Sequence, residues 1–151
     1  MSSPNRIVIV ADNPESTASF RASLASQPDL SFAAAVTCAS CSFAAVSQQR
    51  PALVLIDLKL QEHRLLELAR DLTVLHPRLK ILLVSRHGQE LESDRVLRSG
   101  AHGCISTGSS VTSHLAAVRQ VLRGTPFFPP QNTAHPEAAA ASLCQAALAL
   151  N

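Results

Sequence analysis

Short apolar runs alternate along the chain with longer segments in which apolar residues recur every three or four positions. Five of these runs have the length of a β-strand and lie at Arg6–Ala11, Leu30–Val36, Ala52–Ile56, Leu79–Val84 and His102–Ile105. The segments between them have helical spacing and predict helices. Continuous apolar strands that alternate with helices are typical of a parallel sheet covered on both faces. The pattern therefore predicts one α/β domain with a five-stranded, doubly wound parallel sheet.

Three of the predicted helices have clear apolar stripes. In PESTASFRASLASQ, Pro14 stands at a first-turn position and Phe20 and Leu24 are four residues apart. In LLELARDLTVLH, the stripe consists of Leu65, Leu68, Leu72 and Leu75. In VTSHLAAVRQVLRG, which stops at Gly124, it consists of Val111, Leu115, Val118 and Leu122. Each stripe is expected to be buried on the sheet.

The end of the chain changes character and suggests three parts: a domain at 1–124, a linker at 125–135 and a C-terminal helix or tail at 136–151. The linker TPFFPPQNTAH is rich in proline, which favours an extended path. Pro136 suits the first position of an extra helix, which is followed by strong helix formers. We expect this helix to dock on its own domain or on a partner chain, with a frayed tail as the alternative. Because no Arg or Lys follows Arg123, it is not expected to read DNA.

Composition narrows the functional classes. The chain has 151 residues and a formal net charge of +2, and its basic residues are scattered, so no basic surface for nucleic acid or membrane is indicated. No segment resembles a signal peptide or approaches the roughly 20 apolar residues of a membrane span. The chain is therefore expected to be cytoplasmic, with no membrane contact and with its cysteines reduced.

Two of the cysteines, Cys38 and Cys41, form a C-x-x-C pair. This spacing suits half of a zinc site or a redox pair. No second C-x-x-C and no H-x-x-x-H follows at ligand spacing. Small apolar residues entering a helix are the structural alternative.

Polar side chains stand where three of the predicted strands end. Asp57 closes the third strand, Asp12 follows the first and Ser85 follows the fourth. In a doubly wound sheet the ligand site lies outside the carboxyl ends of the strands, so these groups are expected to converge there. A carboxylate can act as a nucleophile, carboxylates can bind Mg²⁺, and a hydroxyl can donate to a phosphoryl oxygen. Taken singly, Asp12 could cap the first helix and Ser85 could be an ordinary strand-end residue.

Four motifs, RIVIVADNPES, PALVLIDLKL, ILLVSRHGQE and VLRSGAHGCISTGSS, resemble in order and spacing the receiver domains of two-component response regulators. The resemblance covers about residues 5–124 and is greatest to the subgroup with a LuxR-type helix-turn-helix output domain. It implies a flavodoxin-like fold with strand order 2-1-3-4-5. It also implies that Asp57 is the phosphoacceptor, that Asp12 binds Mg²⁺, that Lys59 lends a backbone carbonyl and that the hydroxyl of Ser85 contacts the phosphoryl group.

The chain departs from the family pattern in several places. The first of two consecutive acids is Ala11, the lysine after the fifth strand is Thr107, and the aromatic switch residue is Cys104. The loop after Asp57 has neither the usual proline nor the usual glycine. Losing an acid predicts weaker Mg²⁺ binding, and losing the lysine removes positive charge from the phosphoryl site.

Three residues are candidates to replace the missing groups. Lys59 and Arg86 lie next to site residues in the sequence and could supply charge, and His87 could occupy the space of the aromatic residue. Because neighbours on a strand point to opposite faces, adjacency in sequence does not place Arg86 at the site. A solvated His87 is the structural alternative.

These features predict a degenerate receiver, which is a signalling module and not an enzyme. It would act by homodimerisation with weak or absent phosphorylation at Asp57, with a histidine kinase as candidate partner and DNA reached only through a domain not present in this chain. The alternative is a phosphorylation-independent adaptor or ligand-binding pseudo-receiver. An α/β enzyme using Asp57 and Ser85 is disfavoured, because no motif places a histidine or cysteine base beside a nucleophile.

Overall fold

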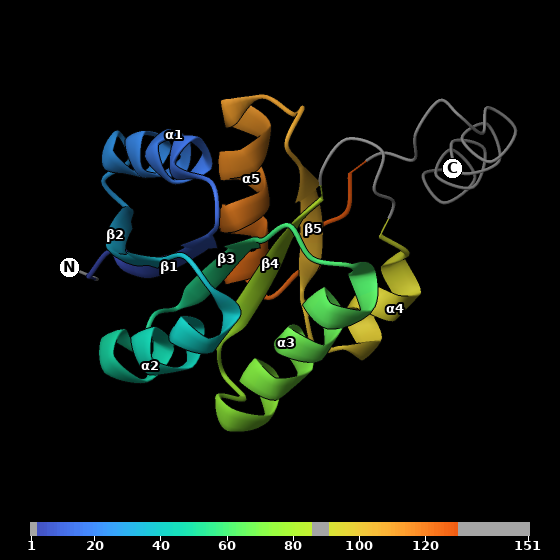
Figure 1. The fold of residues 1–151 in the computed structure, drawn as a ribbon. Helices are drawn as coiled ribbons and strands as arrows, with labels where there is room; N and C mark the ends of the chain where they lie inside the picture. The colour runs from blue at the N-terminus through green and yellow to red at the C-terminus, as the bar shows by residue number, and fades with distance from the viewer. Residues whose placement is uncertain (1–2, 86–90, 130–151) are drawn as a thin grey trace, which may run out of the picture.

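The computed structural model describes residues 3–85 and 91–129 (Figure 1). Its sheet has five parallel strands in the order β2-β1-β3-β4-β5, which confirms the predicted fold. The strands are β1 (Asn5–Ala11), β2 (Leu30–Val36), β3 (Leu53–Asp57), β4 (Lys80–Ser85) and β5 (Gly103–Ser106). The helices are α1 (Pro14–Ala25), α2 (Ala39–Gln49), α3 (Glu62–Leu75), α4 (Ser93–Arg98) and α5 (Val111–Leu122). In the described part of the chain, no helix combines the length and the apolar content needed to cross a bilayer.

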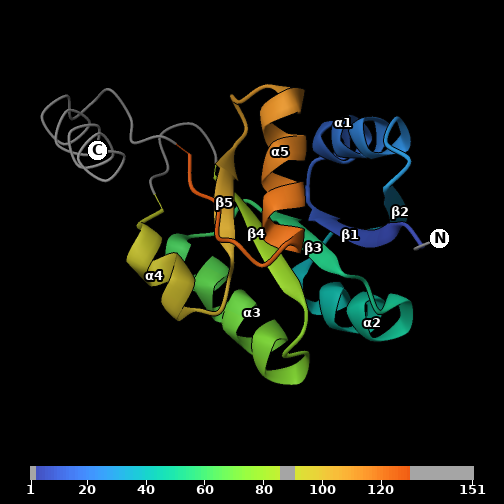
Figure 2. The ribbon, with the colours of Figure 1, turned by 180° about the vertical axis from the view of Figure 1, so that it is seen from behind.

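The helices form two layers, with α1 and α5 on one face of the sheet and α2, α3 and α4 on the other (Figures 1 and 2). Successive strand residues alternate between these faces. In β1, Ile7 and Ile9 join the core cluster beneath α1 and α5, whereas Val8 and Val10 join the cluster beneath α2 and α3. All four side chains are fully buried. The continuous apolar runs of the sequence thus reflect a sheet buried on both sides.

The expected helix stripes pack on the sheet, except at two of their ends. Leu65, Leu68 and Leu72 are buried on α3, but Leu75 is 61% exposed. On α5, Val111 is 49% exposed. The expectation that these two residues are buried was wrong, because each is a terminal residue of its helix and lacks the further helical turn that would help to cover it.

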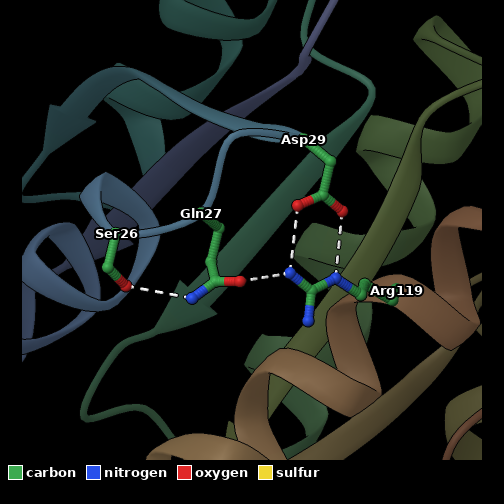
Figure 3. Close-up of polar contacts among 4 residues, drawn as sticks. All are labelled: Ser26, Gln27, Asp29 and Arg119. Carbon is green, nitrogen blue, oxygen red and sulfur yellow. Dashed lines mark hydrogen bonds and ion pairs between the residues drawn. The ribbon is translucent and has the colours of Figure 1, made fainter.

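An ion pair ties α5 to the turn between α1 and β2 (Figure 3). Arg119 donates from Nε and Nη2 to the two carboxylate oxygens of Asp29 at 2.9 and 3.0 Å, and Nη2 also donates to the side-chain oxygen of Gln27. The hydrogen bond from Arg119 lowers the pKa of Asp29, and Asp29 in turn raises the pKa of Arg119. This bidentate geometry links two elements that are distant in the sequence on the same face of the sheet.

Residues 125–129, called the strap below, turn back after α5 and lie along the edge strand β5 (Figure 2). The backbone N–H of Phe127 donates to the carbonyl of His102 at 3.1 Å, and the N–H of Cys104 donates to the carbonyl of Phe127 at 2.9 Å. The first part of the predicted linker is therefore hydrogen-bonded to the sheet and covers its edge. The rest of that linker and the helix predicted at 136–151 lie outside the described residues.

Gly103→Ala is expected to detach the strap, because a Cβ built on Gly103 would lie on the carbonyl oxygen of Phe127. Overpacking of this kind lowers the free energy of unfolding by about 1–3 kcal/mol, and chemical denaturation should show a loss of that order. Hydrogen exchange at the amides of Cys104 and Phe127 should become faster. The control is Gly108→Ala, whose added Cβ would meet only Ser106 Oγ, at 3.8 Å. Equal exchange in the two variants would contradict the role of the strap.

Candidate functional site

The carboxyl ends of the strands meet at one edge of the sheet, and the polar residues singled out in the sequence lie there. Asp57 is the last residue of β3 and pairs in register with Ala11, the last residue of β1. Ser85 is the last residue of β4 and pairs with Ser106 on β5. Asp12 directly follows β1. The parallel topology thus brings these groups to a common edge, and their chemical roles remain predictions.

The carboxyl group of Asp57 is buried. Its residue is 0% exposed, and its neighbour Ala11 is 1% exposed. Paired residues of adjacent strands point to the same face, so the methyl group of Ala11 is the neighbour of this carboxylate on β1. A charge at this position is therefore shielded from bulk water. Electrostatic interactions are stronger in such a shielded site than in bulk water.

Asp12 is exposed and is joined to the loop after β3. Its Oδ2 accepts a hydrogen bond of 2.7 Å from the backbone N–H of Lys59. Its own N–H donates to the carbonyl of Asp57 at 3.4 Å. The capping role considered for Asp12 belongs to its neighbour, since Asn13 is the N-cap of α1 and accepts from the N–H of Glu15 at 2.9 Å. The Asn-Pro pair in the sequence was the signal for this cap.

The donors at this edge are of the kind that Mg²⁺ takes, but there are few of them. In the part of the chain that the structure describes, the candidate ligands are the carboxylates of Asp12 and Asp57 and the backbone carbonyl of Lys59. Ala11 has no side-chain oxygen to add. Among the described residues no group of three or more His, Cys, Asp or Glu side chains could hold a metal ion. The donor set therefore fits a magnesium ion in kind and is one carboxylate short of the family pattern.

Ser85 and Thr107 lie at the end of the β4–β5 pair. The hydroxyl of Ser85 donates to the carbonyl of Ile105 at 3.2 Å, and the N–H of Thr107 donates to the carbonyl of Ser85 at 3.0 Å. The hydroxyl proton of Ser85 is thus engaged within the sheet and would have to turn to reach a phosphoryl oxygen. Thr107 is exposed and brings no positive charge.

Cys104, at the position of the family's aromatic residue, is buried in the core. It is 3% exposed and belongs to the same core cluster as Val8 and Val10, beneath α2, α3 and α4. Burial raises the pKa of its thiol to about 11, so the group is neutral near pH 7. The aromatic side chain of Phe128 packs against this same cluster from the strap. Arg86 and His87, the other candidates to replace family groups, lie outside the described residues.

The sequence did not predict that the strap pairs with the edge strand β5. Phe127 and Gly103 form a parallel bridge that no periodicity in the sequence predicts. A glycine inside a short strand was the available signal, since it often marks the close approach of another backbone.

Residues 7–119 match the family model of the response regulator receiver domain. The chain belongs to this family. The receiver is 26% identical over 128 residues to the transcriptional regulatory protein DegU of Brevibacillus brevis, covering 85% of this chain and 54% of DegU. It is 30% identical over 82 residues to the response regulator GacA of Pseudomonas protegens, covering 54% of this chain and 38% of GacA. The receiver thus spans about half or less of the relatives it matches.

Solved structures have the same fold as the receiver. A LuxR-family response regulator from Aurantimonas sp. SI85-9A1 superposes with a TM-score of 0.76 at 21% identity, covering 88% of this chain and 94% of that one. The isolated receiver domain of RcsB from Salmonella enterica serovar Typhimurium, with phosphomimetic BeF₃⁻, gives a TM-score of 0.72 at 16% identity, covering 83% and 94%. At these identities the likeness concerns the fold alone.

Ala11→Asp is expected to couple the receiver's stability to Mg²⁺. The added carboxylate would lie beside Asp57, and two buried like charges repel each other unless a cation binds between them. Without Mg²⁺ the thermal midpoint should fall below that of the unmodified chain. With Mg²⁺ it should recover, and affinity for the ion should rise about tenfold, or about 1.4 kcal/mol.

Isothermal titration and thermal unfolding with and without Mg²⁺ test this expectation. Ala116→Asp is the matched control, because it adds the same charge on an exposed position of α5. Equal Mg²⁺ affinity for the Ala11→Asp variant and the unmodified chain would count against the magnesium site.

Proposed function

We propose that this receiver is an atypical signalling module of the cytoplasm that acts through homodimerisation, with weak or absent phosphorylation at Asp57, and not as an enzyme. The observation that carries the proposal is the pairing of Asp57 with a buried alanine, Ala11, at the place where the family pattern has an acid. This pairing leaves the phosphoacceptor position without a second fixed carboxylate on the adjacent strand.

Burial of Asp57 supports weak phosphorylation. Transfer of a phosphoryl group requires the donor to approach the carboxylate oxygen in line, and this residue is 0% exposed. Among the described residues, two positions expected to stabilise the transferred charge do not do so: Thr107 is neutral, and the hydroxyl proton of Ser85 is bonded to the carbonyl of Ile105. Loss of one such stabilising donor slows related reactions by about 100- to 1,000-fold.

Magnesium would be held weakly. The ligands we propose are the carboxylates of Asp12 and Asp57 and the carbonyl of Lys59. When bound, the ion would offset negative charge on phosphoryl oxygens. Asp12 already accepts a hydrogen bond from the N–H of Lys59. This hydrogen bond orients the carboxylate and engages one of its oxygens.

A switch needs groups that bind differently in the two states, because a ligand shifts an equilibrium only by its differential affinity. In this chain Thr107 stands at the position of the lysine that would bind the phosphoryl group. The buried Cys104 stands at the position of the aromatic residue that would change conformation in response. Neither has the charge or the aromatic ring of the family pattern. We therefore expect little conformational response at Asp57.

The partners follow from the same proposal. A histidine kinase is the candidate phosphodonor. DNA would be reached only through a domain outside this chain, in keeping with the name of DegU, a transcriptional regulatory protein of which this chain covers 54%. The alternative is a phosphorylation-independent adaptor or ligand-binding pseudo-receiver, which the burial of Asp57 favours. An unchanged affinity for a regulatory partner after Asp57→Asn would favour the alternative.

Exposed apolar side chains support self-association. Val74 and Leu75 at the end of α3 are 72% and 61% exposed, and Val111 at the start of α5 is 49% exposed. From the sequence, the candidates for a dimer contact are α5 and the Ala-rich tail, which lies outside the described residues. The adjacent pair on α3 offers the larger apolar surface, and apolar surface of this kind is stabilised by burial against a second copy.

Phosphorylation is tested with acetyl phosphate and Mg²⁺, read by intact mass. We expect slow or no labelling of the unmodified chain and labelling at least about tenfold faster in Ala11→Asp/Thr107→Lys, which restores an acid and a cation. Adding Asp57→Asn to that variant should abolish the label. In the unmodified background Asp57→Asn should leave folding and self-association nearly unchanged. Rapid, complete labelling of the unmodified chain would refute the proposal.

Dimerisation is tested by light scattering at tens of micromolar protein, with the full chain and with residues 125–151 removed. We expect a species of twice the 16.0 kDa chain mass. Leu75→Glu should reduce it because a charge would be placed in the apolar contact, whereas Val111→Glu, with the same change on α5, should not. A single 16 kDa species in the unmodified protein would exclude homodimerisation as the mechanism.

A further inference from the structure

The two cysteines of the C-x-x-C pair lie at the start of α2, in positions the receiver function does not use. Cys38 is the N-cap of this helix and Cys41 is in its first turn. Their Sγ atoms are 2.6 Å apart. Because α2 follows β2, the pair lies beyond the carboxyl end of that strand, at the same edge of the sheet as Asp12 and Asp57.

Helix geometry explains why the sulfur atoms meet. The side chain of an N-cap residue folds toward the third helical residue, as in a capping box. Here Ala39 is the first helical residue, so Cys41 is the third. The 2.6 Å separation is close to the bonded sulfur distance of about 2.0 Å in a disulfide. The backbone thus holds the two thiols in reach of bond formation without rearrangement of the helix.

The pair is also accessible from solvent. Cys41 is exposed and Cys38 is partly exposed, in contrast to the buried Cys104. A groove of about 330 Å³ between α1 and the end of β2 reaches Thr37, the residue before Cys38. Arg21 lines this groove and brings positive charge to it. The groove thus offers a positively charged surface next to the residue that precedes Cys38, which favours the approach of a small anionic molecule.

We propose that Cys38 and Cys41 form a redox-active dithiol that exchanges with low-molecular-weight disulfides of the glutathione class. The alternative of a half zinc site gains no support, because the described ranges 3–85 and 91–129 contain no cluster of three or more His, Cys, Asp or Glu side chains suited to a metal ion. Small apolar residues would explain packing at this position, and the exposure of Cys41 does not fit that explanation.

The exchange has two steps. The thiolate of Cys38 attacks one sulfur of the small disulfide, the bond between the two small-molecule sulfurs breaks, and one thiolate leaves. Cys41 then loses its proton to water and attacks Sγ of Cys38, which releases the second small thiolate. The protein loses two electrons and two protons, and the small disulfide is reduced to two thiols.

The environment favours Cys38 as the first nucleophile. Side-chain hydrogen bonding, with Cys41 first and Ser40 second, lowers the pKa of Cys38, whereas hydrogen bonding with Cys38 raises the pKa of Cys41. The positive end of a helix also stabilises a thiolate at its N-terminus. The Sγ of Cys38 lies 3.4 Å from the hydroxyl of Ser40 and 2.6 Å from Sγ of Cys41, so both groups can stabilise a thiolate there.

The full chain, reduced and treated with a chelator, is incubated in buffers of increasing oxidised glutathione content and analysed by intact mass and peptide mapping. We expect a product lighter by two hydrogens, with the bond mapped to Cys38 and Cys41 and reversed by dithiothreitol. Cys41→Ser should stop at a mixed disulfide between glutathione and Cys38. In Cys38→Ser, the remaining thiol of Cys41 should react with glutathione disulfide at least about tenfold more slowly than Cys38 does in Cys41→Ser. Cys144→Ser is the matched control and should behave as the unmodified chain.

Three results would overturn the proposal. They are a disulfide mapped to Cys104 or Cys144, a glutathione adduct on the unmodified chain that does not close, and equal reactivity of the Cys38→Ser and Cys41→Ser variants. Because none of these readouts involves phosphodonor labelling or oligomeric state, failure here leaves the proposed receiver function intact.

Discussion

The parallel pairing of β1 with β3 is the constraint on which the site depends. These neighbouring strands run in register from Ile7 and Leu53 to Ala11 and Asp57, so both end at the same level of the sheet. The backbone hydrogen bonds of that pairing, with apolar side chains buried on both faces, hold Asp57 at the rim of the core. Asp12 directly follows β1, and this position places its Oδ2 2.7 Å from the backbone nitrogen of Lys59.

Under the proposed function, the same pairing gives a single departure from the family pattern a large expected effect. An acid at the position of Ala11 would face the carboxylate of Asp57 from the adjacent strand, and a cation would have two fixed charges to bind. With a methyl group there, the carboxylate has an apolar neighbour, and the remaining acid, Asp12, is partly engaged by the loop. Thr107, at the position of the family's lysine, brings no positive charge to the same edge. The fold tolerates both departures from the family pattern, because Ala11 packs in the apolar core and Thr107 is exposed. In the function we propose, these departures reduce the electrostatic contacts of a phosphoryl switch.

Two features outside that site modify the edges of the domain. The strap closes the exposed edge of β5 through the backbone of Phe127, and Gly103 permits the approach because it has no Cβ. After β2, the edge strand opposite β5, Cys38 and Cys41 meet because the first turn of α2 brings an N-cap side chain over the third helical residue. Both features involve segments whose chemistry differs from that of the region around Asp57.

The sequence by itself determined the elements, because their signals are local. The apolar runs predicted all five strands to within about one residue, and the strand ends of a doubly wound sheet predicted the common edge of Asp12, Asp57 and Ser85. The sheet order was implied by the resemblance of the four motifs to receiver domains. Only the tertiary structure decided how those groups are paired: the register of Ala11 with Asp57, the engagement of the Ser85 hydroxyl by Ile105, and the return of the strap to β5. The physical reason is that periodicity reports burial along one segment, whereas register, hydrogen-bond partners and exposure depend on which distant segment lies alongside.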